Sequence, residues 1–431
     1  MLVIVALLIL LVCLVIGVPI PLSFLTSAAY LCFTSGFDPK MLLIAGYNKT
    51  YSTLLLTIPL FVLAGSIIDK GGIGEKLVGT IERFVGKVKG GLGIVAIVAC
   101  AVFGAVSGSS SATLSCIGSI MTPRLRENGY SNGTIGAILA SSGVLGILIP
   151  PSMIMILYAW AGGVSVLSCF LATVIPGILL VILFSVINVY WAKHNPNIKV
   201  YDHLVKKAEA GAKKERGGSA IPAVLMPVII LGGIYSGLFT PTEAAAIAVF
   251  YGIIVSAFVY RNMGWKDFIH VLSASASSTA SILFLVANAH IFSYLLSSEQ
   301  IPQKLAILMT SLTTNPTIIM FLIMIVLLIA GCFLDNAVAV ILLTPIFVNV
   351  VQAMNIDICY FGVFLVFVLA IGQVTPPVGL CLFVACDIGK VSIEKVSREV
   401  LPYVGGLIVT AILLVLFPQI VTWLPSLTKM A

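Results

Sequence analysis

Charged residues are scarce in this chain, and their scarcity excludes a water-soluble fold. Only 9% of the 431 residues are Asp, Glu, Lys or Arg, while 60% are hydrophobic. A soluble domain carries about 25% charged residues and leaves much of its chain at a wet surface. We therefore expect the lipid bilayer to be the solvent for most of this protein.

Signatures of several other protein classes are also missing. There is no GxxxxGK[ST] loop for nucleotide-driven transport, and Met1 to Ile4 lack the basic region of a cleavable signal peptide. The histidines have no metal-ligand spacing: His194, His203, His270 and His290. No CxxC pair occurs, so we interpret the nine cysteines as small core residues and not as metal ligands or disulfides: Cys13, Cys32, Cys100, Cys116, Cys169, Cys332, Cys359, Cys381 and Cys386.

Long apolar runs are what the chain does have. They are continuous and not alternating, which favours membrane helices over a barrel of strands. We predict an all-α, polytopic membrane protein with about ten membrane helices, at residues 2–20, 22–36, 52–68, 132–163, 168–192, 220–236, 242–260, 267–296, 358–386 and 401–424.

Two further apolar stretches, 92–123 and 317–350, are each too long for one helix and are interrupted near the middle. The interruptions run from 104 to 111 and from 331 to 336. Each half then has roughly 13–16 residues, fewer than the about 20 that span a bilayer. A re-entrant hairpin fits better, because protein or a wet cavity can satisfy the backbone groups at its tip.

Basic residues are unevenly distributed between the connecting loops. Of the 23 Lys and Arg residues, 19 lie in the loops at 69–91, 124–130, 193–219, 261–266 and 387–399. The positive-inside rule assigns these loops to the cytoplasm, so both termini are expected in the periplasm. The same distribution accounts for the formal charge of +7 without a nucleic-acid partner.

The second half of the chain repeats motifs of the first. Thr-Pro at 122–123 recurs at 344–345, Gly-x-x-x-Pro-Pro at 146–151 recurs at 372–377, and two further matches have nearly the same offset. Matches in order at one offset indicate a duplication. Because the two halves would start on opposite sides, we predict inverted repeats at 1–192 and 220–431, joined by a cytoplasmic linker at 193–219.

Residues 74–89 alternate charged and apolar side chains at helical spacing. We interpret them as an interfacial helix lying along the membrane, with an ordinary loop helix as the alternative.

Four broken elements form the candidate site: two hairpin tips and two breaks in the facing helices. Glycine lets backbone approach a ligand, hydroxyls bind hard cations and carboxylates, a half-helix N-terminus favours anions, and proline leaves carbonyls free for Na⁺. The candidate substrate- and ion-binding residues, with Na⁺ expected at the same positions, are Ser107, Gly108, Ser109, Ser110, Ser111, Thr113, Gly146, Ile149, Pro150, Pro151, Gly331, Asp335, Asn336, Gly372, Thr375, Pro376 and Pro377.

Structural alternatives stay open at these positions. Ser and Gly also let membrane helices pack closely. A carboxylate in an apolar stretch is typical of a functional site, yet Asp335 could instead cap the half-helix that follows. Glu243 follows Pro241-Thr242 and is predicted to start a helix in a structural role.

No Lys or Arg occurs at either tip. An anionic substrate would then depend on helix N-termini, hydroxyls and bound cations. Cation binding and anion binding would be mutually dependent, which is a physical basis for ion coupling.

Six motifs make the chain resemble the large membrane subunit of tripartite ATP-independent periplasmic (TRAP) transporters, the DctM-like family, over nearly its whole length. They are IPLFVLAG at 58–65, AVSGSS at 105–110, IPPS at 149–152, GLFTPTEAA at 237–245, YFG at 360–362 and VTPPVG at 374–379.

The resemblance implies a Na⁺-driven importer with an elevator-type transport domain in a bacterial inner membrane. Family substrates are carboxylates such as C4-dicarboxylates, sialic acids and other sugar acids. A separate small four-helix membrane subunit and a periplasmic substrate-binding protein, which selects the substrate, would be the partners. Family Na⁺ sites match 107–113 with 146–151, and 331–336 with 372–377, although Asn336 departs from the apolar or hydroxyl residue of many relatives.

Other functions compete with this reading. A stand-alone Na⁺/carboxylate symporter of similar architecture would need no binding protein. An intramembrane enzyme would need a nucleophile with its base, or metal ligands, and the tip serines have no in-membrane His or Lys in their pattern. We therefore expect no enzymatic activity and no cofactor other than Na⁺ as coupling ion. A channel is also disfavoured, because it would have no need for two alternating gates.

Overall fold

Helices make up the regular structure of this protein. The computed structural model describes residues 2–85, 88–200, 219–376 and 379–427. Within these ranges the regular elements are helical apart from one isolated bridge between Lys89 and Val200, which confirms the all-α prediction.

The helices of the first part of the chain are α1 (Leu2–Ile16), α2 (Ile20–Ser35), α3 (Pro39–Thr50), α4 (Thr57–Lys70), α5 (Ile73–Val85), α6 (Gly91–Ser107), α7 (Ser110–Glu127), α8 (Asn132–Gly143), α9 (Leu145–Leu148), α10 (Met153–Gly162) and α11 (Val166–His194). Those of the second part are α13 (Ile221–Tyr235), α14 (Pro241–Ile254) with the π-helical turn η1 (Val255–Val259), α15 (Trp265–Ser298), α16 (Ile301–Leu312), α17 (Pro316–Phe333), α18 (Asn336–Ala353), α19 (Ile358–Gln373), α20 (Leu380–Gly389), α21 (Ile393–Leu416) and α22 (Gln419–Leu427).

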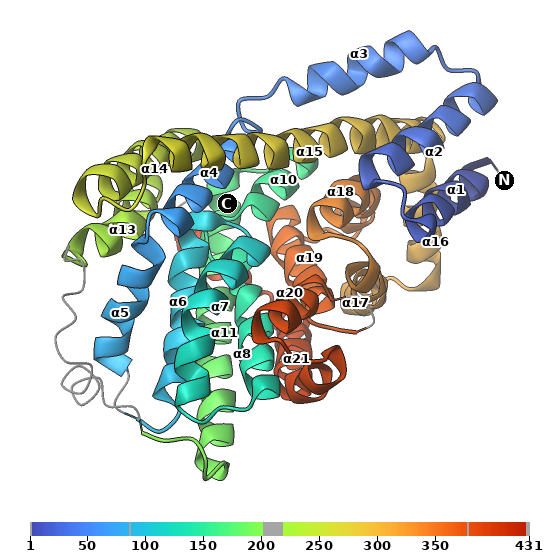
Figure 1. Ribbon diagram of the computed structural model, residues 1–431. Coiled ribbons are helices and arrows are strands. Elements are labelled where there is room, and N and C mark those ends of the chain that lie inside the picture. The colour runs from blue at the N-terminus through green and yellow to red at the C-terminus, as the bar shows by residue number, and fades with distance from the viewer. Residues whose placement is uncertain (1, 86–87, 201–218, 377–378, 428–431) are drawn as a thin grey trace.

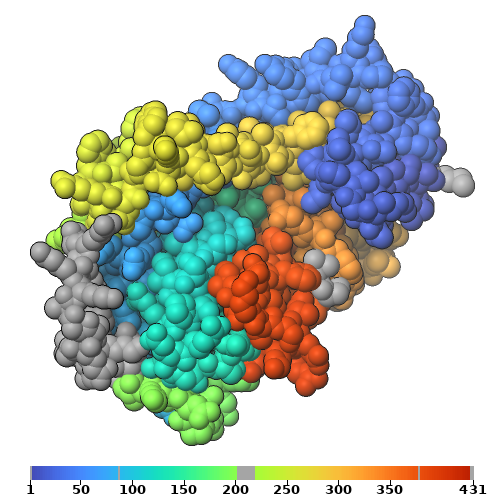
Figure 2. Space-filling model, viewed as in Figure 1, coloured from blue at the N-terminus to red at the C-terminus, as the bar shows by residue number. Residues whose placement is uncertain are grey.

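The 34-residue helix α15 runs along one edge of the molecule and packs on α2, α3 and α4 (Figure 1). The helices of the two hairpins and the two broken helices gather beneath it, between α13 and α14 at one end and α1, α2 and α16 at the other. In the space-filling view α15 borders this inner group along its whole upper side (Figure 2). The candidate site therefore lies in the part of the protein that other helices surround.

Six described helices are long and apolar enough to cross a membrane, and up to eight crossings result if each bent pair counts as one. They are α11, α14 with η1, α15, α17, α18 and α21, with α4–α5 and α8–α10 as the bent pairs. The predicted spans at 2–20, 22–36 and 220–236 are apolar helices of 15, 16 and 15 residues. This is the architecture of a multi-pass membrane protein.

Three details of the prediction are wrong. The half-helices of the hairpins have 17 or 18 residues and not 13–16, because their apolar segments continue closer to the turn than the break motifs suggested. Helices α17 and α18 are each long and apolar enough to cross a membrane. Their length therefore no longer indicates that the second hairpin is re-entrant. Helices α3 and α16 were not predicted, because each has only 12 residues and polar residues interrupt its apolar run.

Several helices are interrupted within the segments that the sequence analysis singled out. Gly108-Ser109 separates α6 from α7, and Leu334-Asp335 separates α17 from α18. The helix at 132–162 is interrupted at 149–152, where its axis bends by 43°, and the helix that begins at Ile358 is interrupted between Gln373 and Leu380. The first hairpin is tightly packed, whereas α17 packs mainly on α19 and α18 mainly on α16 and α10.

Helix α5 (Ile73–Val85) covers most of the segment predicted as an interfacial helix. It packs on α6, and Glu82 is almost completely buried beneath Arg124 of α7. The two charged groups are 2.9 Å apart, from Arg124 Nη1 to Glu82 Oε2. This ion pair joins α5 to the first hairpin, so at least one face of the helix has a protein partner.

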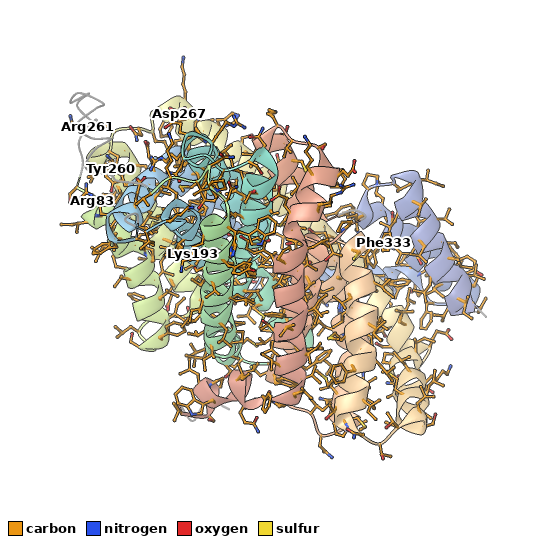
Figure 3. The ribbon with its side chains drawn as sticks, turned by 90° about the horizontal axis from the view of Figure 1, so that it is seen from below. Arg83, Lys193, Tyr260, Arg261, Asp267 and Phe333 are labelled. Atoms are coloured by element: carbon orange, nitrogen blue, oxygen red, sulfur yellow. The ribbon has the colours of Figure 1, made fainter. Side chains whose placement is uncertain are left out.

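The five basic loops lie together on one face of the molecule. Four hydrogen bonds connect them in series, from Asn262 to the Gly71 carbonyl, from Lys89 to the Lys193 carbonyl, from the Lys199 N–H to the Asn128 carbonyl, and from Arg126 to the Gly389 carbonyl. Arg83 and Arg261, from two of these loops, lie at the same edge in Figure 3. The clustering agrees with the charge-based layout, in which one face of the protein is basic.

The charge distribution predicts which compartment this face meets. Lys199 and Gln303 are both exposed, one on the basic face and one in α16. We expect Lys199→Cys to react with a membrane-impermeant maleimide only after cells are permeabilised, and Gln303→Cys to react in intact cells, with peptide mapping used to set aside the native thiols. Labelling of Lys199→Cys from outside intact cells would reverse the orientation.

Candidate functional site

The first hairpin tip is built by a glycine and a capping serine. Helix α6 ends at Ser107, and Gly108 has a φ of 61°, which glycine adopts without strain. Ser109 is extended and caps α7, since its hydroxyl accepts a hydrogen bond from the Ala112 N–H at 3.4 Å. As predicted, the N-terminus of α7 opens at this tip.

Hydroxyl groups are concentrated at this tip. The Ser107 and Thr113 side chains are buried and 2.9 Å apart between Oγ and Oγ1. The Ser109 and Ser111 hydroxyls are half-buried and 3.2 Å apart. The tip therefore presents several neutral oxygen atoms within a few ångströms of one another.

The tip is seated directly on the first helix break. Met153 donates its N–H to the Gly108 carbonyl at 3.3 Å. Ile149 is extended, and Pro150 and Pro151 have no N–H to offer the carbonyls one turn earlier in α9. Ser152 then restarts the helix by capping α10, accepting from the Met155 N–H at 3.3 Å.

Glycines make this close approach possible. A methyl group at Gly146 would lie 2.6 Å from Thr113 Oγ1 and 2.7 Å from the Ser109 carbonyl oxygen. A methyl group at Gly65 of α4 would lie 3.2 Å from Ser107 Cβ. The candidate residues of the first tip and break are thus brought together, and α4 closes the tip from a third side.

The second tip is built around Asp335 and Asn336. Asp335 is half-buried and caps α18, with its carboxylate accepting from the Ala337 N–H at 2.9 Å, so the capping alternative is what the structure shows. Asn336 is only 1% exposed, and neither its Oδ1 nor its Nδ2 has a hydrogen-bond partner within the described part of the chain. A buried amide without partners is costly, so Asn336 remains a candidate ligand-binding residue.

The second tip also touches the break in its facing helix. A methyl group at Gly372 would overlap the backbone of Gly331, and one at Gly331 would lie 3.0 Å from the Leu369 carbonyl oxygen. The Thr375 hydroxyl donates to the Ile371 carbonyl at 2.7 Å, and Pro376 is exposed. Pro377 lies outside the described residues.

The second break is linked to the first tip by residues that the sequence analysis did not select as site residues. The Cys381 thiol, just after the second break, lies beside the Ser110 side chain of the first tip, where α20 packs on α7. It also contacts Gln373 Oε1 at 3.5 Å, and Gln373 is buried. A glutamine within an otherwise apolar run was the signal that could have identified this position.

Each broken helix reaches across to the other hairpin. Helix α20 packs on α7 and α8 of the first part, while α10 packs on α18 and α19 of the second. Both tips and both breaks therefore belong to one packed unit, and its polar atoms are hydroxyls, carbonyls, one amide pair and one carboxylate. Such a set binds small charged solutes and ions without a fixed positive side chain.

This arrangement defines a polytopic membrane protein with paired hairpin-tip sites, and comparisons with known proteins identify its family. The family model described as "Tripartite ATP-independent periplasmic transporter, DctM component" matches residues 7–420. The chain belongs to this family, which places it among transporter permeases and not among enzymes.

Individual relatives support the assignment. The chain is 37% identical over 407 residues to the "C4-dicarboxylate TRAP transporter large permease protein DctM" of Pseudomonas aeruginosa, covering 93% of each chain. It is 33% identical to the "Isethionate TRAP transporter permease protein DctMQ" of Oleidesulfovibrio alaskensis, matching 94% of this chain but 64% of that longer protein. The YdaH transporter of Alcanivorax borkumensis shares the fold with a TM-score of 0.62 at 14% identity, over 86% of each chain.

The contact between the second tip and its break predicts the effect of a single methyl group. Gly372→Ala forces the Gly331 backbone away from α19, and overpacking of this kind costs about 1–3 kcal/mol. The thermal unfolding midpoint of the purified protein should fall. Gly405→Ala in α21 is the matched control, since its methyl group meets no atom within 4 Å. Equal midpoints for the two variants would show that the tip does not rest on the break.

Proposed function

We propose that this chain is the large membrane subunit of a Na⁺-coupled secondary importer of small organic anions. The observation that carries the proposal is the pair of hairpin tips, each seated on the break of a facing helix. The proposal extends to the architecture: inverted repeats at 1–192 and 220–431, and an elevator-type movement of the unit that holds the tips.

The position of the tips supports re-entrant hairpins. Gly331, in the last turn of α17, touches α19 beside its break, and this break lies between α19 and α20, in the middle of the segment from Ile358 to Gly389. A turn at that depth is away from both membrane surfaces. Backbone that is not helical is tolerated there only when protein or a wet cavity satisfies it.

The donors at the tips suit Na⁺, a hard cation that prefers oxygen ligands. Hydroxyls of Ser107, Thr113 and Ser109 and the carbonyls beside Pro150 would hold one ion. The orphaned Oδ1 of Asn336 and the carbonyls beside Gly372 would contribute to a second position. A bound ion would supply the positive charge that these residues lack.

An anion would be held by the helix N-termini at the tips. The N-termini of α7 and α18 begin there, and helix N-termini stabilise negative charge. Since no Lys or Arg occurs at 104–113, 146–152, 331–336 or 372–376, the anion depends on the cations for charge balance. The names of two relatives include C4-dicarboxylate and isethionate, which favours a small organic acid as the substrate of this chain.

Two partners complete the proposed system. The family is described as tripartite, so we infer a small four-helix membrane subunit and a periplasmic substrate-binding protein as the other two components. The proposed location is the inner membrane of a bacterium, with both termini in the periplasm. The comparisons do not favour a stand-alone symporter.

Substitutions at the tips should weaken Na⁺ more than they weaken the fold. We expect Ser107→Ala and Asn336→Ala, each of which removes one proposed ligand, to raise the Na⁺ concentration for half-maximal uptake about fivefold to hundredfold, because one lost ligand costs about 1–3 kcal/mol. Ser119→Ala is the control, since its hydroxyl bonds only the Cys116 carbonyl within α7. If all well-expressed tip variants keep the wild-type Na⁺ half-saturation, the tips serve only to pack the helices and do not bind Na⁺.

The energy source and the partners can be tested in one preparation. Vesicles containing this chain, its small subunit and the binding protein should take up substrate when a Na⁺ gradient is imposed, with no requirement for ATP. Uptake should stop when the binding protein is omitted or when choline replaces Na⁺. Undiminished uptake without the binding protein would favour the stand-alone symporter, and undiminished uptake in choline would remove Na⁺ coupling.

A further inference from the structure

Two cysteines from opposite halves of the chain meet in the structure. Cys169 lies in the first turn of α11 and Cys359 in the first turn of α19, and their sulfur atoms are 3.8 Å apart. Cys169 is completely buried, whereas Cys359 is half-buried. The sequence analysis treats both as core residues because their spacing along the chain gives no sign of contact.

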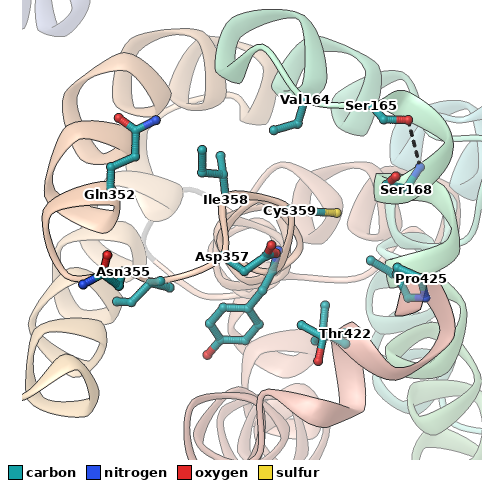
Figure 4. A pocket seen from close by; sticks show the side chains of 14 residues that line it. Val164, Ser165, Ser168, Gln352, Asn355, Asp357, Ile358, Cys359, Thr422 and Pro425 are labelled. Carbon is teal, nitrogen blue, oxygen red and sulfur yellow. Dashed lines mark hydrogen bonds between the residues drawn. The ribbon is translucent and has the colours of Figure 1, made fainter. Parts of the chain in front are cut away.

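A cavity gives small molecules access to this pair. It has a volume of about 690 Å³ and is lined by the loops before α11 and α19 together with α22. Cys359, Asp357, Ser165, Ser168 and Thr422 are among its lining residues. Figure 4 shows Cys359 between the cavity and α11, with its sulfur directed toward that helix. A volume of this size accommodates a small organic reagent.

The pair lies at the end of the molecule opposite the basic face. Helix α11 ends at His194, beside the Lys89 contact of the basic loops, so its first turn is at the other end. Helices α19 and α20 follow one another, and α20 ends at Gly389, which contacts Arg126 of the basic face. The first turn of α19 therefore lies at the other end as well. By the positive-inside rule the two thiols then face the periplasmic side, where disulfides form and persist.

We propose that Cys169 and Cys359 form a reversible disulfide that joins α11 to α19. The oxidant is a small disulfide or a thiol–disulfide oxidoreductase in its oxidised form. The Cys359 thiolate attacks one sulfur of the oxidant and expels the other as a thiolate, giving a mixed disulfide at Cys359. The Cys169 sulfur, after losing its proton, attacks Cys359 Sγ and expels the second oxidant sulfur. Two protein thiols are oxidised and one oxidant disulfide is reduced to two thiols.

The geometry suits this closure. A disulfide has sulfur atoms about 2.05 Å apart, so the present separation must shorten by about 1.8 Å, which small side-chain rotations in the first turns of two helices provide. The bond would join the two halves of the chain near the cavity. It leaves the tips and breaks unaltered, because neither cysteine belongs to them.

Peptide mapping of the purified full-length protein tests the proposal. After incubation with oxidised glutathione and quenching with N-ethylmaleimide, we expect a linked peptide containing Cys169 and Cys359, which dithiothreitol separates. The oxidised protein should also show a higher thermal unfolding midpoint than the reduced protein. Cys359→Ser should abolish both effects, and Cys13→Ser in α1, which removes another half-buried thiol, should leave both unchanged.

Recovery of both cysteines as maleimide adducts after oxidation would overturn the proposal. So would a linked peptide that persists in Cys359→Ser, or a linked peptide that pairs either cysteine with a different partner. If Cys359→Ser does not fold, Cys169→Ser serves as the second variant, and in that case Cys359 should become a stable mixed disulfide with glutathione. Absence of that adduct would equally contradict the mechanism.

Discussion

The contact between each hairpin tip and the break in its facing helix is the constraint on which the structure depends. A turn and a helix break both expose backbone N–H and carbonyl groups, and lipid cannot satisfy them. The first tip satisfies one such pair with the hydrogen bond from the Met153 N–H to the Gly108 carbonyl. At the second tip the Asp335 carboxylate accepts from the Ala337 N–H, and Gly331 of α17 packs against Gly372 of α19 beside the break. Irregular backbone can therefore persist inside an apolar protein because four irregular elements cover one another.

The same constraint selects the chemistry of the site. Close backbone contact requires glycine, and caps require Ser109, Ser152 and Asp335, so the tips are rich in neutral oxygen atoms and poor in positive charge. The Asn336 amide, which has no hydrogen-bond partner among the described residues, adds a buried donor and a buried acceptor that the helix caps do not use. In the function we propose, such a site would hold an anion only together with cations, and their shared charge balance would couple the two.

The positions of the helix breaks could be predicted from the sequence, because Gly, Ser and Pro interrupt long apolar runs in recognisable ways. The breaks at 108–109, 149–152 and 334–335 and the capping box of Thr240 and Glu243 follow from local chemistry. Helices α3 and α16 were not predicted, since short helices that contain several polar residues have no strong hydropathy signal. The length of the hairpin arms was misjudged because Gly104 and Gly331 remain helical.

Contacts between distant parts of the chain could not be predicted from local patterns. The link between Ser110 and Cys381, the burial of Gln373 and the approach of Cys169 to Cys359 all depend on how α20 and α19 pack against the first half. Periodicity indicates which residues face inward, but it does not pair them. The five basic loops are the exception, because membrane topology alone brings residues of like charge to one face.

Equilibrium binding of radioactive sodium to the purified chain tests the central claim most directly. The account predicts saturable binding to the wild-type protein, tightened by a small organic anion, and its loss in the double variant Ser107→Ala with Asn336→Ala while the thermal unfolding midpoint stays close to that of the wild type. Saturable binding of equal affinity in that double variant, or no saturable binding to a folded wild-type protein, would contradict it.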